Sequence, residues 1–198
     1  MMDNSFLALL FRMKHINRWG LMYNTRPENL SEHSFECALL AHFLAAIGNA
    51  CFGKSFDGDK LAAHALFHDA SEVLTGDLPA PVKYFGAEIT KAYKDLEGAA
   101  GEKLLGYLPP GLREMYSGYF SGAGLSGEEK TLIKNADKLC AHIKCIQELN
   151  AGNKEFRAAY NSTRAGVDAM TADEAVYFRE NCLGAFALSL DEIKGTLE

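Results

Sequence analysis

The chain has 198 residues, of which 48% are hydrophobic and 23% are charged, so its composition excludes a disordered or fibrous protein. A formal net charge of −6 disfavours a general nucleic-acid partner, because contacts to many phosphates require a basic surface. The five cysteines are odd in number and form no CxxC pair, so neither a disulfide framework nor a zinc ribbon is indicated.

The N-terminal sequence MMDNSFLALLFRMK places its charge after the apolar stretch and lacks a small-residue cleavage site, which is typical of a helix and not of a signal peptide. The apolar runs are too short to cross a bilayer, so no membrane association is expected. Long linkers and repeats are absent from the sequence. We therefore expect a cytoplasmic protein that forms one domain over residues 1–198.

Helix signals recur along the chain and strand signals are almost absent, which predicts an all-α fold. Two S/T-x-x-E capping boxes, Ser126 with Glu129 and Thr171 with Glu174, mark predicted helix starts. The segment 76–81 cannot continue a helix, because each of its prolines lacks an N–H and disfavours a helical predecessor. In chain order, we expect helices over residues 3–15, 31–49, 59–75, 87–106, 110–120, 127–150, 153–169 and 172–190.

The predicted helix 31–49 is apolar almost all round, which is typical of a central helix enclosed by others. His33 lies in its first turn and heads an apolar row at helical spacing, so its imidazole is expected at the edge of a dry interior. A lone histidine in such a place is more often a hydrogen-bonded core residue than a ligand. The function of His33 therefore depends on what lies near it.

The predicted helix 59–75 presents His68, Asp69 and Glu72 on one face, if it turns regularly by 100° per residue. An ordinary amphipathic helix with a solvated face is the alternative interpretation. However, residues 61–76 contain no Lys, Arg or Gln, and every ionisable group there is His, Asp or Glu. These residue types indicate metal binding and proton transfer.

Asp137 lies at the margin of the apolar stripe of the predicted helix 127–150. A carboxylate that faces inward would need a cation or a partner, whereas one that faces outward would be an ordinary surface charge. The spacing leaves both possibilities open. Together, two imidazoles and two carboxylates suit a divalent transition metal with room for water. Such an ion supplies what phosphate ester hydrolysis requires, and Glu72 could accept or orient a proton.

These residues resemble the H…HD…D signature of the HD-domain phosphohydrolase superfamily, with His33, the dipeptide His68–Asp69, and Asp137. The neighbouring segments are more specific. INRWGLM at 16–22, RPENLSEH at 26–33, FHDASEVLTGDLPAPVKYF at 67–85 and KNADKLCAHIKCIQEL at 134–149 resemble the bacterial 5'-deoxynucleotidase family, and the similarity runs over nearly the whole chain.

The resemblance implies a cytoplasmic homodimer with an all-α, HD-domain helical bundle and a metal site between central helices. It implies hydrolysis of deoxyribonucleoside 5'-monophosphates to the deoxynucleoside and phosphate, with cobalt or a similar divalent ion such as manganese.

Roles for individual residues follow from the resemblance alone. Arg18 would orient the phosphate, and Glu72 would transfer a proton. The metal ligands would be His33, His68, Asp69 and Asp137, and the substrate contacts would be Arg18, Trp19, His33, Asp69, Asp77, Leu78, Pro79, Ala80 and Asp137, with residues 77–80 lining the sugar pocket.

Two alternatives stay open. Another HD enzyme, a deoxynucleoside triphosphate triphosphohydrolase or a cyclic nucleotide phosphodiesterase, would share the metal site and differ in the pocket. A noncatalytic binding protein would keep the fold without turnover. Base preference and the physiological metal are not determined by these residues, and Phe and Tyr residues in the segment 107–120 suggest a subunit interface if they are exposed.

Overall fold

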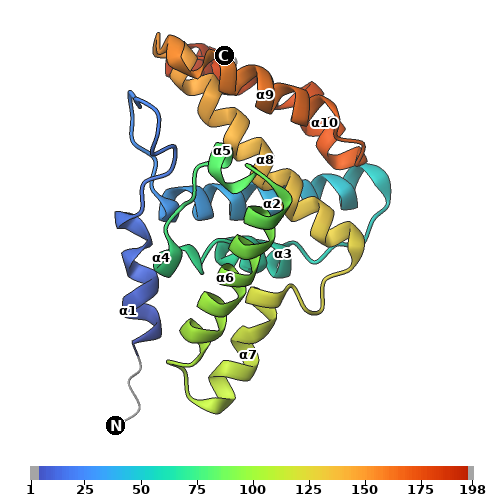
Figure 1. The fold of residues 1–198 in the computed structure, drawn as a ribbon. Helices are drawn as coiled ribbons and strands as arrows, with labels where there is room; N and C mark the ends of the chain where they lie inside the picture. The colour runs from blue at the N-terminus through green and yellow to red at the C-terminus, as the bar shows by residue number, and fades with distance from the viewer. Residues whose placement is uncertain (1–4, 196–198) are drawn as a thin grey trace.

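The computed structural model describes residues 5–195, and within them all regular elements are helical, as predicted (Figure 1). The only β-type pairing in this range is an isolated bridge between Asn17 and Asn29. In chain order the helices are α1 (Phe6–Leu10), η1 (Phe11–His15), α2 (Leu30–Phe52), α3 (Gly58–Phe67), α4 (Glu72–Thr75), α5 (Ala80–Lys83), α6 (Ala87–Leu105), α7 (Pro110–Ser121), α8 (Gly127–Asn150), η2 (Lys154–Phe156), α9 (Arg157–Asp168), α10 (Asp173–Asn181), η3 (Leu183–Ala187) and α11 (Leu190–Gly195).

The long helices α2 and α8 lie at the centre of the fold, where α2 packs against α3, α8 and α10 (Figure 1). Their inward faces form the larger of two buried apolar clusters, which includes Leu44 on α2 and Leu139 on α8. By length and composition alone, α2 could cross a membrane. In this fold it is a core helix, because many of its side chains are buried in this cluster.

The prediction that α2 is enclosed on all sides is wrong for one face. Phe35, Leu39 and Phe43 are 58%, 56% and 47% exposed. They lie four residues apart, so they share a face of the helix that is largely uncovered, with Phe43 meeting Phe178 of α10 edge to face at 6.2 Å. This α2 stripe, Phe35 with Leu39 and Phe43, is the apolar surface that the sequence pattern could not distinguish from core.

Aromatic residues of the segment 107–120 are half-buried against the chain itself, which weakens the suggestion of an interface there. Tyr116 meets Phe6 edge to face at 5.3 Å and Phe67 at 5.6 Å, while Phe120 lies 6.2 Å from Phe6. These rings cover the second apolar cluster, which joins α1, η1 and the start of α2. Aromatic side chains of α7 therefore hold the N-terminal helix onto the core.

The predicted helix 59–75 is broken, because α3 ends at Phe67 and α4 begins at Glu72. Between them, backbone hydrogen bonds join residues three apart in the chain. The N–H of His68 donates to the carbonyl of Ala65, and the N–H of Glu72 donates to that of Asp69. Such bonds tighten a helix. His68 Nδ1 also lies 2.6 Å from the Ala65 carbonyl, so the imidazole stabilises the turn at residues 68–71.

The other differences are at helix ends. The Thr171–Glu174 capping box does not form: α10 begins at Asp173 with no side-chain cap, and Glu174 is buried against α2 near Gly48 instead of reaching back. The predicted helix 172–190 divides into α10 and η3, with α11 beyond it, and the predicted helix 3–15 divides into α1 and η1, its residues 3 and 4 lying outside the described range. The predicted capping box of Ser126 with Glu129 is confirmed.

A buried carboxylate on α8 anchors the loop that follows η1. Glu148, 2% exposed, accepts hydrogen bonds from the backbone N–H groups of Thr25 and Arg26 and pairs with Lys144. Lys144 also donates to the Arg26 carbonyl, and Asn153 donates to Glu148. Burial works against the charge, but the lysine and the N–H donors outweigh it and lower the pKa of Glu148 to about 2.

We expect Glu148→Gln to lower the free energy of unfolding at pH 7 by about 3 kcal/mol, the order found when one partner of a buried ion pair is removed. Because the folded pKa lies below the ordinary value of 4.5, the stabilisation by Glu148 is present above that pH and is lost as the pH falls towards 2. The difference between wild type and variant, measured by urea unfolding, should therefore shrink below pH 4.5. Glu155→Gln is the control, since Glu155 accepts from Tyr23 at an exposed position; equal losses in both variants would contradict the role of Glu148.

Candidate metal centre

His33 is placed by the start of α2. Asn29 caps this helix, accepting hydrogen bonds from the N–H groups of Ser31 and Glu32, while the Glu32 carboxylate accepts from the Asn29 N–H. This reciprocal capping box fixes the first turn of the helix. The imidazole of His33 is consequently held at a defined point, and it is fully buried.

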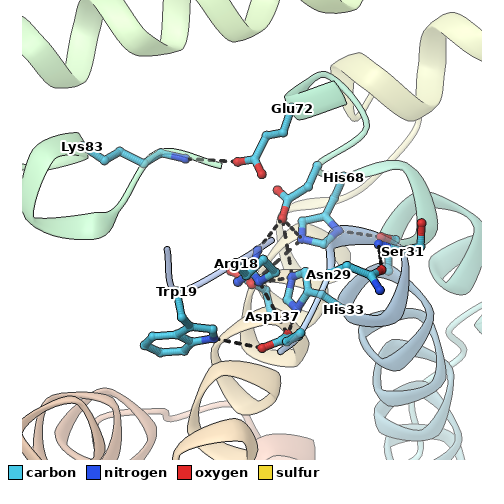
Figure 2. A network of polar contacts seen from close by, with 12 residues as sticks. Arg18, Trp19, Asn29, Ser31, His33, His68, Glu72, Lys83 and Asp137 are labelled. Carbon is cyan, nitrogen blue, oxygen red and sulfur yellow. Dashed lines mark hydrogen bonds and ion pairs between the residues drawn. The ribbon is translucent and has the colours of Figure 1, made fainter. Parts of the chain in front are cut away.

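Asp137, on α8, faces inward, which resolves the question that the sequence left open. Its Oδ1 lies 3.3 Å from His33 Nε2 and 3.9 Å from His68 Nε2. Asp69 Oδ2 lies 3.5 Å from His33 Nε2 and 3.1 Å from His68 Nε2. The four predicted ligands, from α2, the turn at 68–71 and α8, therefore meet at one point (Figure 2).

This arrangement fits a metal ion. Donor atoms of His33, His68 and Asp69 all lie within 4.8 Å of one another, and Asp137 lies beside them. Both ring nitrogens of His33 and Nε2 of His68 are buried without a hydrogen bond among the described residues. The His68 Nδ1 contact to the Ala65 carbonyl fixes the ring so that Nε2 faces the cluster, as in histidine metal ligands.

The electrostatics of the cluster favour charged forms of all four groups. Burial acts to lower the pKa of His33 and of His68, yet the carboxylates beside them raise both. Burial likewise acts to raise the pKa of Asp69 and of Asp137, yet the two imidazoles lower both, Asp69 well below its usual range. The carboxylates therefore favour positive charge at this point, whether it is carried by the imidazoles or by a cation.

Glu28 is a site residue that the sequence interpretation did not single out. It is 8% exposed, and its carboxylate lies 3.5 Å from His33 Nδ1 and 3.5 Å from Arg18 Nε. It also accepts a hydrogen bond from the indole N–H of Trp19 at 2.9 Å. One carboxylate therefore connects a predicted metal ligand with both predicted substrate residues of the INRW segment.

Arg18 and Trp19 differ in their distance from the cluster. Arg18 donates from Nη1 to Asp69 Oδ2 at 3.2 Å, so its guanidinium borders the metal ligands. Trp19 has a backbone φ of 59°, in the left-handed region that non-glycine residues rarely adopt, and its ring packs against Phe156 at 5.4 Å. Strain of this kind is retained where the surroundings fix a side chain in position.

Glu72 lies at the start of α4, 2% exposed, with its carboxylate pointing towards Lys83 at 4.0 Å (Figure 2). Burial, with the negative charges of Asp69 and Asp77, raises the pKa of Glu72 to about 9. The carboxyl group therefore holds a proton at neutral pH. The prediction that it shares a helical face with His68 is wrong, since the turn at 68–71 separates them.

Asp77, Leu78, Pro79 and Ala80 form the loop after α4 and the first residue of α5. Both ends of this segment are attached to α6: Tyr93 donates to the Gly76 carbonyl at 3.1 Å and Thr90 donates to the Lys83 carbonyl at 2.8 Å. Asp77 lies near enough to Arg18 for their charges to interact. His68 and Asp69 open onto a cavity of about 450 Å³ that reaches α6 and α7, and residues 77–80 are not part of its lining.

Comparison with known proteins identifies the family. The family model described as 5'-deoxynucleotidase YfbR-like matches residues 5–186. The 5'-deoxynucleotidases YfbR of Shigella flexneri and of Escherichia coli are 49% and 48% identical to the chain, over 98% of it and 97% of each relative. The chain belongs to the YfbR-like 5'-deoxynucleotidase family. The family and the class of enzyme predicted from the sequence are thereby confirmed.

Solved structures confirm the predicted HD-domain fold. An HD-domain phosphohydrolase from Listeria innocua has a TM-score of 0.81 at 21% identity, covering 96% of this chain and 92% of that one. The HD phosphohydrolase DatZ of cyanophage S-2L, solved with dA and one catalytic Zn²⁺, has a TM-score of 0.60 at 20% identity, covering 89% and 95%.

We expect Glu28→Ala to release Trp19 from its only described hydrogen-bond acceptor. Trp19 is the sole tryptophan of the chain, so its fluorescence reports on this contact directly. A shift of the emission maximum and a weaker near-UV circular dichroism signal should result, with far-UV circular dichroism unchanged. Glu88→Ala, on the exposed surface of α6, is the control, and identical spectra for wild type and Glu28→Ala would show that Glu28 does not hold the indole.

Proposed function

We propose that this chain is a metal-dependent 5'-deoxynucleotidase, which hydrolyses deoxyribonucleoside 5'-monophosphates to the deoxynucleoside and phosphate. The observation that carries the proposal is that a chain nearly half identical to curated 5'-deoxynucleotidases over almost its full length brings His33, His68, Asp69 and Asp137 to one point. The substrate is a small molecule, so neither a nucleic acid nor a membrane is a partner in the reaction.

His33, His68, Asp69 and Asp137 are the proposed ligands of a divalent cation, with cobalt as the expected ion and manganese as the alternative. Two nitrogen and two oxygen donors suit several transition metals. Bound there, the cation would lower the pKa of a water molecule and neutralise phosphate oxygens. Imidazole nitrogens that make no hydrogen bond to any described residue, and the carboxylate of Asp137 beside them, support this assignment.

Arg18 is the proposed phosphate ligand. Its Nε faces Glu28 and its Nη1 faces Asp69, and no contact within the described residues occupies Nη2. A planar guanidinium held in this way can donate to phosphate oxygens beside the cation without reorienting. The two carboxylates therefore position the arginine, and Trp19, attached to the same Glu28, completes that wall of the substrate site.

Glu72 is the proposed proton-transfer group. Its pKa of about 9 means that it holds a proton at neutral pH, which it can give to the departing 5'-oxygen of the deoxyribose. Lys83 at 4.0 Å stabilises the carboxylate that remains. Phosphate monoester hydrolysis needs such a transfer, because the leaving alkoxide is a strong base.

Asp77, Leu78, Pro79 and Ala80 are the proposed sugar pocket. Hydrogen bonds from Tyr93 to the Gly76 carbonyl and from Thr90 to the Lys83 carbonyl attach both flanks of this segment to α6. A wall held in this way close to the 2'-carbon would leave no room for a hydroxyl and would thereby select deoxyribose. Overpacking of this kind discriminates because closely packed groups cannot move aside without cost.

We further propose a single domain over residues 1–198, a cytoplasmic location and a homodimer. One domain is supported by α2, which contributes Leu30 to the second apolar cluster and Leu44 to the first. The exposed α2 stripe is the surface that best fits a second copy, because contiguous exposed apolar side chains mark interfaces. A mass of one chain in light scattering would contradict the dimer.

The activity is tested by phosphate release from deoxyribonucleoside and ribonucleoside monophosphates, each with Co²⁺, Mn²⁺ or Zn²⁺. We expect hydrolysis of dAMP and dGMP, much less of AMP, and no triphosphate from dGTP. Release of triphosphate from dGTP without hydrolysis of dAMP would establish a deoxynucleoside triphosphate triphosphohydrolase instead. Bound metal without hydrolysis of any substrate would establish a noncatalytic protein.

We expect Asp137→Ala to weaken metal binding by more than about 100-fold, beyond the 10-fold to 100-fold typical of outer-shell changes, because an anionic ligand is lost. Turnover should vanish with it. Metal content after dialysis is measured by atomic absorption. Asp95→Ala, at an exposed position on α6, is the matched control, and metal content at the wild-type level in Asp137→Ala would remove Asp137 from the ligand set.

We expect Glu72→Gln to lower kcat by about 100-fold to 10,000-fold, the usual range for general acid–base catalysis, while metal content stays at the wild-type level. The amide keeps the size and neutral charge of the protonated acid and lacks the transferable proton. Glu88→Gln on α6 serves as the control. A kcat within twofold of wild type would exclude Glu72 from proton transfer.

A further inference from the structure

A second cavity, of about 530 Å³, lies away from the metal centre, between the C-terminal half of α8 and the helices α9, α10 and η3. None of its lining residues belongs to the metal cluster or to the loop 77–80. In Figure 1, α9 and α10 lie beside the upper part of α8, on the far side from α6 and α7. The volume is within the range of small-molecule sites.

The lining of this cavity is cationic in an otherwise acidic chain. Arg157, Arg164 and Arg179 face it, against one carboxylate, Glu180. Arg179 donates to the carbonyls of Val167 and Asp168 and pairs with Glu180 at 3.4 Å, while Arg164 Nε donates to both carboxylate oxygens of Asp168 at 2.9 Å. Arg157 has no partner among the described residues. The positive charge of Arg157 is therefore left without an acidic partner at this cavity, in a chain whose net charge is −6.

The deeper wall carries a buried imidazole with an unused acceptor. His142 is 0% exposed, and its Nδ1 lies 2.9 Å from Thr163 Oγ1. That hydroxyl donates to backbone carbonyls of its own helix, at 2.9 Å to Ala159 and 3.1 Å to Tyr160, so the shared proton belongs to Nδ1. Nε2 is then a lone-pair acceptor, and it has no partner among the described residues. Burial and the charge of Arg164 lower the pKa of His142, consistent with a neutral ring.

The remaining walls are apolar and aromatic. Ile146, Leu149 and Leu183 provide aliphatic surface, and Tyr160 lies against the His142 ring with centroids 4.9 Å apart. A ligand that satisfies all these groups needs an anionic part for the arginines, a flat or apolar body, and an N–H or O–H donor for Nε2. A nucleotide has all three, since its base and sugar carry N–H and O–H groups.

We propose that this cavity binds a nucleoside triphosphate, at a site separate from the metal centre. The length of the anionic part follows from α9, where Arg157 and Arg164 are seven residues apart on one face, about 10.5 Å along the axis. One phosphate contacts one such arginine, whereas a chain of phosphates reaches both. The site requires no hydrolysis and does not rest on the deoxynucleotidase activity.

The test is equilibrium dialysis of ATP against the full-length chain. We expect saturable binding that Arg157→Glu weakens more than tenfold, since the substitution reverses a charge that has no structural partner. Arg113→Glu is the matched control, because Arg113 lies on α7 paired with Glu102 and faces neither site. Arg18→Ala, at the metal centre, should leave ATP binding unchanged.

A second variant tests the nucleoside part. His142→Phe keeps an aromatic ring against Tyr160 and removes Nε2, so it should weaken ATP binding at least threefold and leave tripolyphosphate binding as in wild type. Tripolyphosphate binding as tightly as ATP would overturn the nucleotide assignment. Absence of saturable binding, equal binding by Arg157→Glu, or loss of binding in Arg18→Ala would overturn the site itself, with circular dichroism confirming that each variant is folded.

Discussion

The structure depends on one electrostatic constraint, the concentration of carboxylates around a fully buried imidazole. His33 has Glu28 on one side of its ring and Asp69 with Asp137 on the other, all within 3.5 Å. Three negative charges so close together repel one another, so positive charge must accompany them. Arg18 supplies part of it at 3.2 Å from Asp69, and, against the effect of burial, the carboxylates raise the pKa of His33 and of His68, which favours the charged imidazoles. A divalent cation would supply the positive charge with the imidazoles neutral.

Much of the surrounding chain positions this cluster. The capping box at Asn29 orients His33, and the Glu148 network attaches Thr25 and Arg26 to α8, the helix that also carries Asp137. The segment 16–29, which these two anchors hold, contains Arg18, Trp19 and Glu28, whose contacts to one another close the site from one side. Stability of the loop and geometry of the site are consequently coupled through α8.

The sequence predicts which side chains come together at the cluster, because metal chemistry restricts candidate ligands to few residue types and the apolar pattern places His33 near the interior. It predicts Glu28 poorly. The contacts of Glu28 to His33 and Trp19 arise from the path of the loop, and no periodicity encodes that path. The α2 stripe was misassigned for a related reason, since an apolar face looks the same in sequence whether a neighbouring helix covers it or not. Residue type is local information, whereas coverage and loop path are tertiary.

The break between α3 and α4 shows how tertiary structure decides the geometry of the candidate metal centre. Consecutive residues point about 100° apart in an α-helix and about 120° apart in a tighter turn, so backbone periodicity alone does not bring His68 and Asp69 together. Their side chains meet nevertheless, since His68 Nε2 lies 3.1 Å from Asp69 Oδ2. The His68 ring is held for this contact by its Nδ1, which lies 2.6 Å from the Ala65 carbonyl in the last turn of α3. The end of α3 therefore fixes the orientation of the imidazole, and the side chains of the pair complete the contact that helical spacing does not encode.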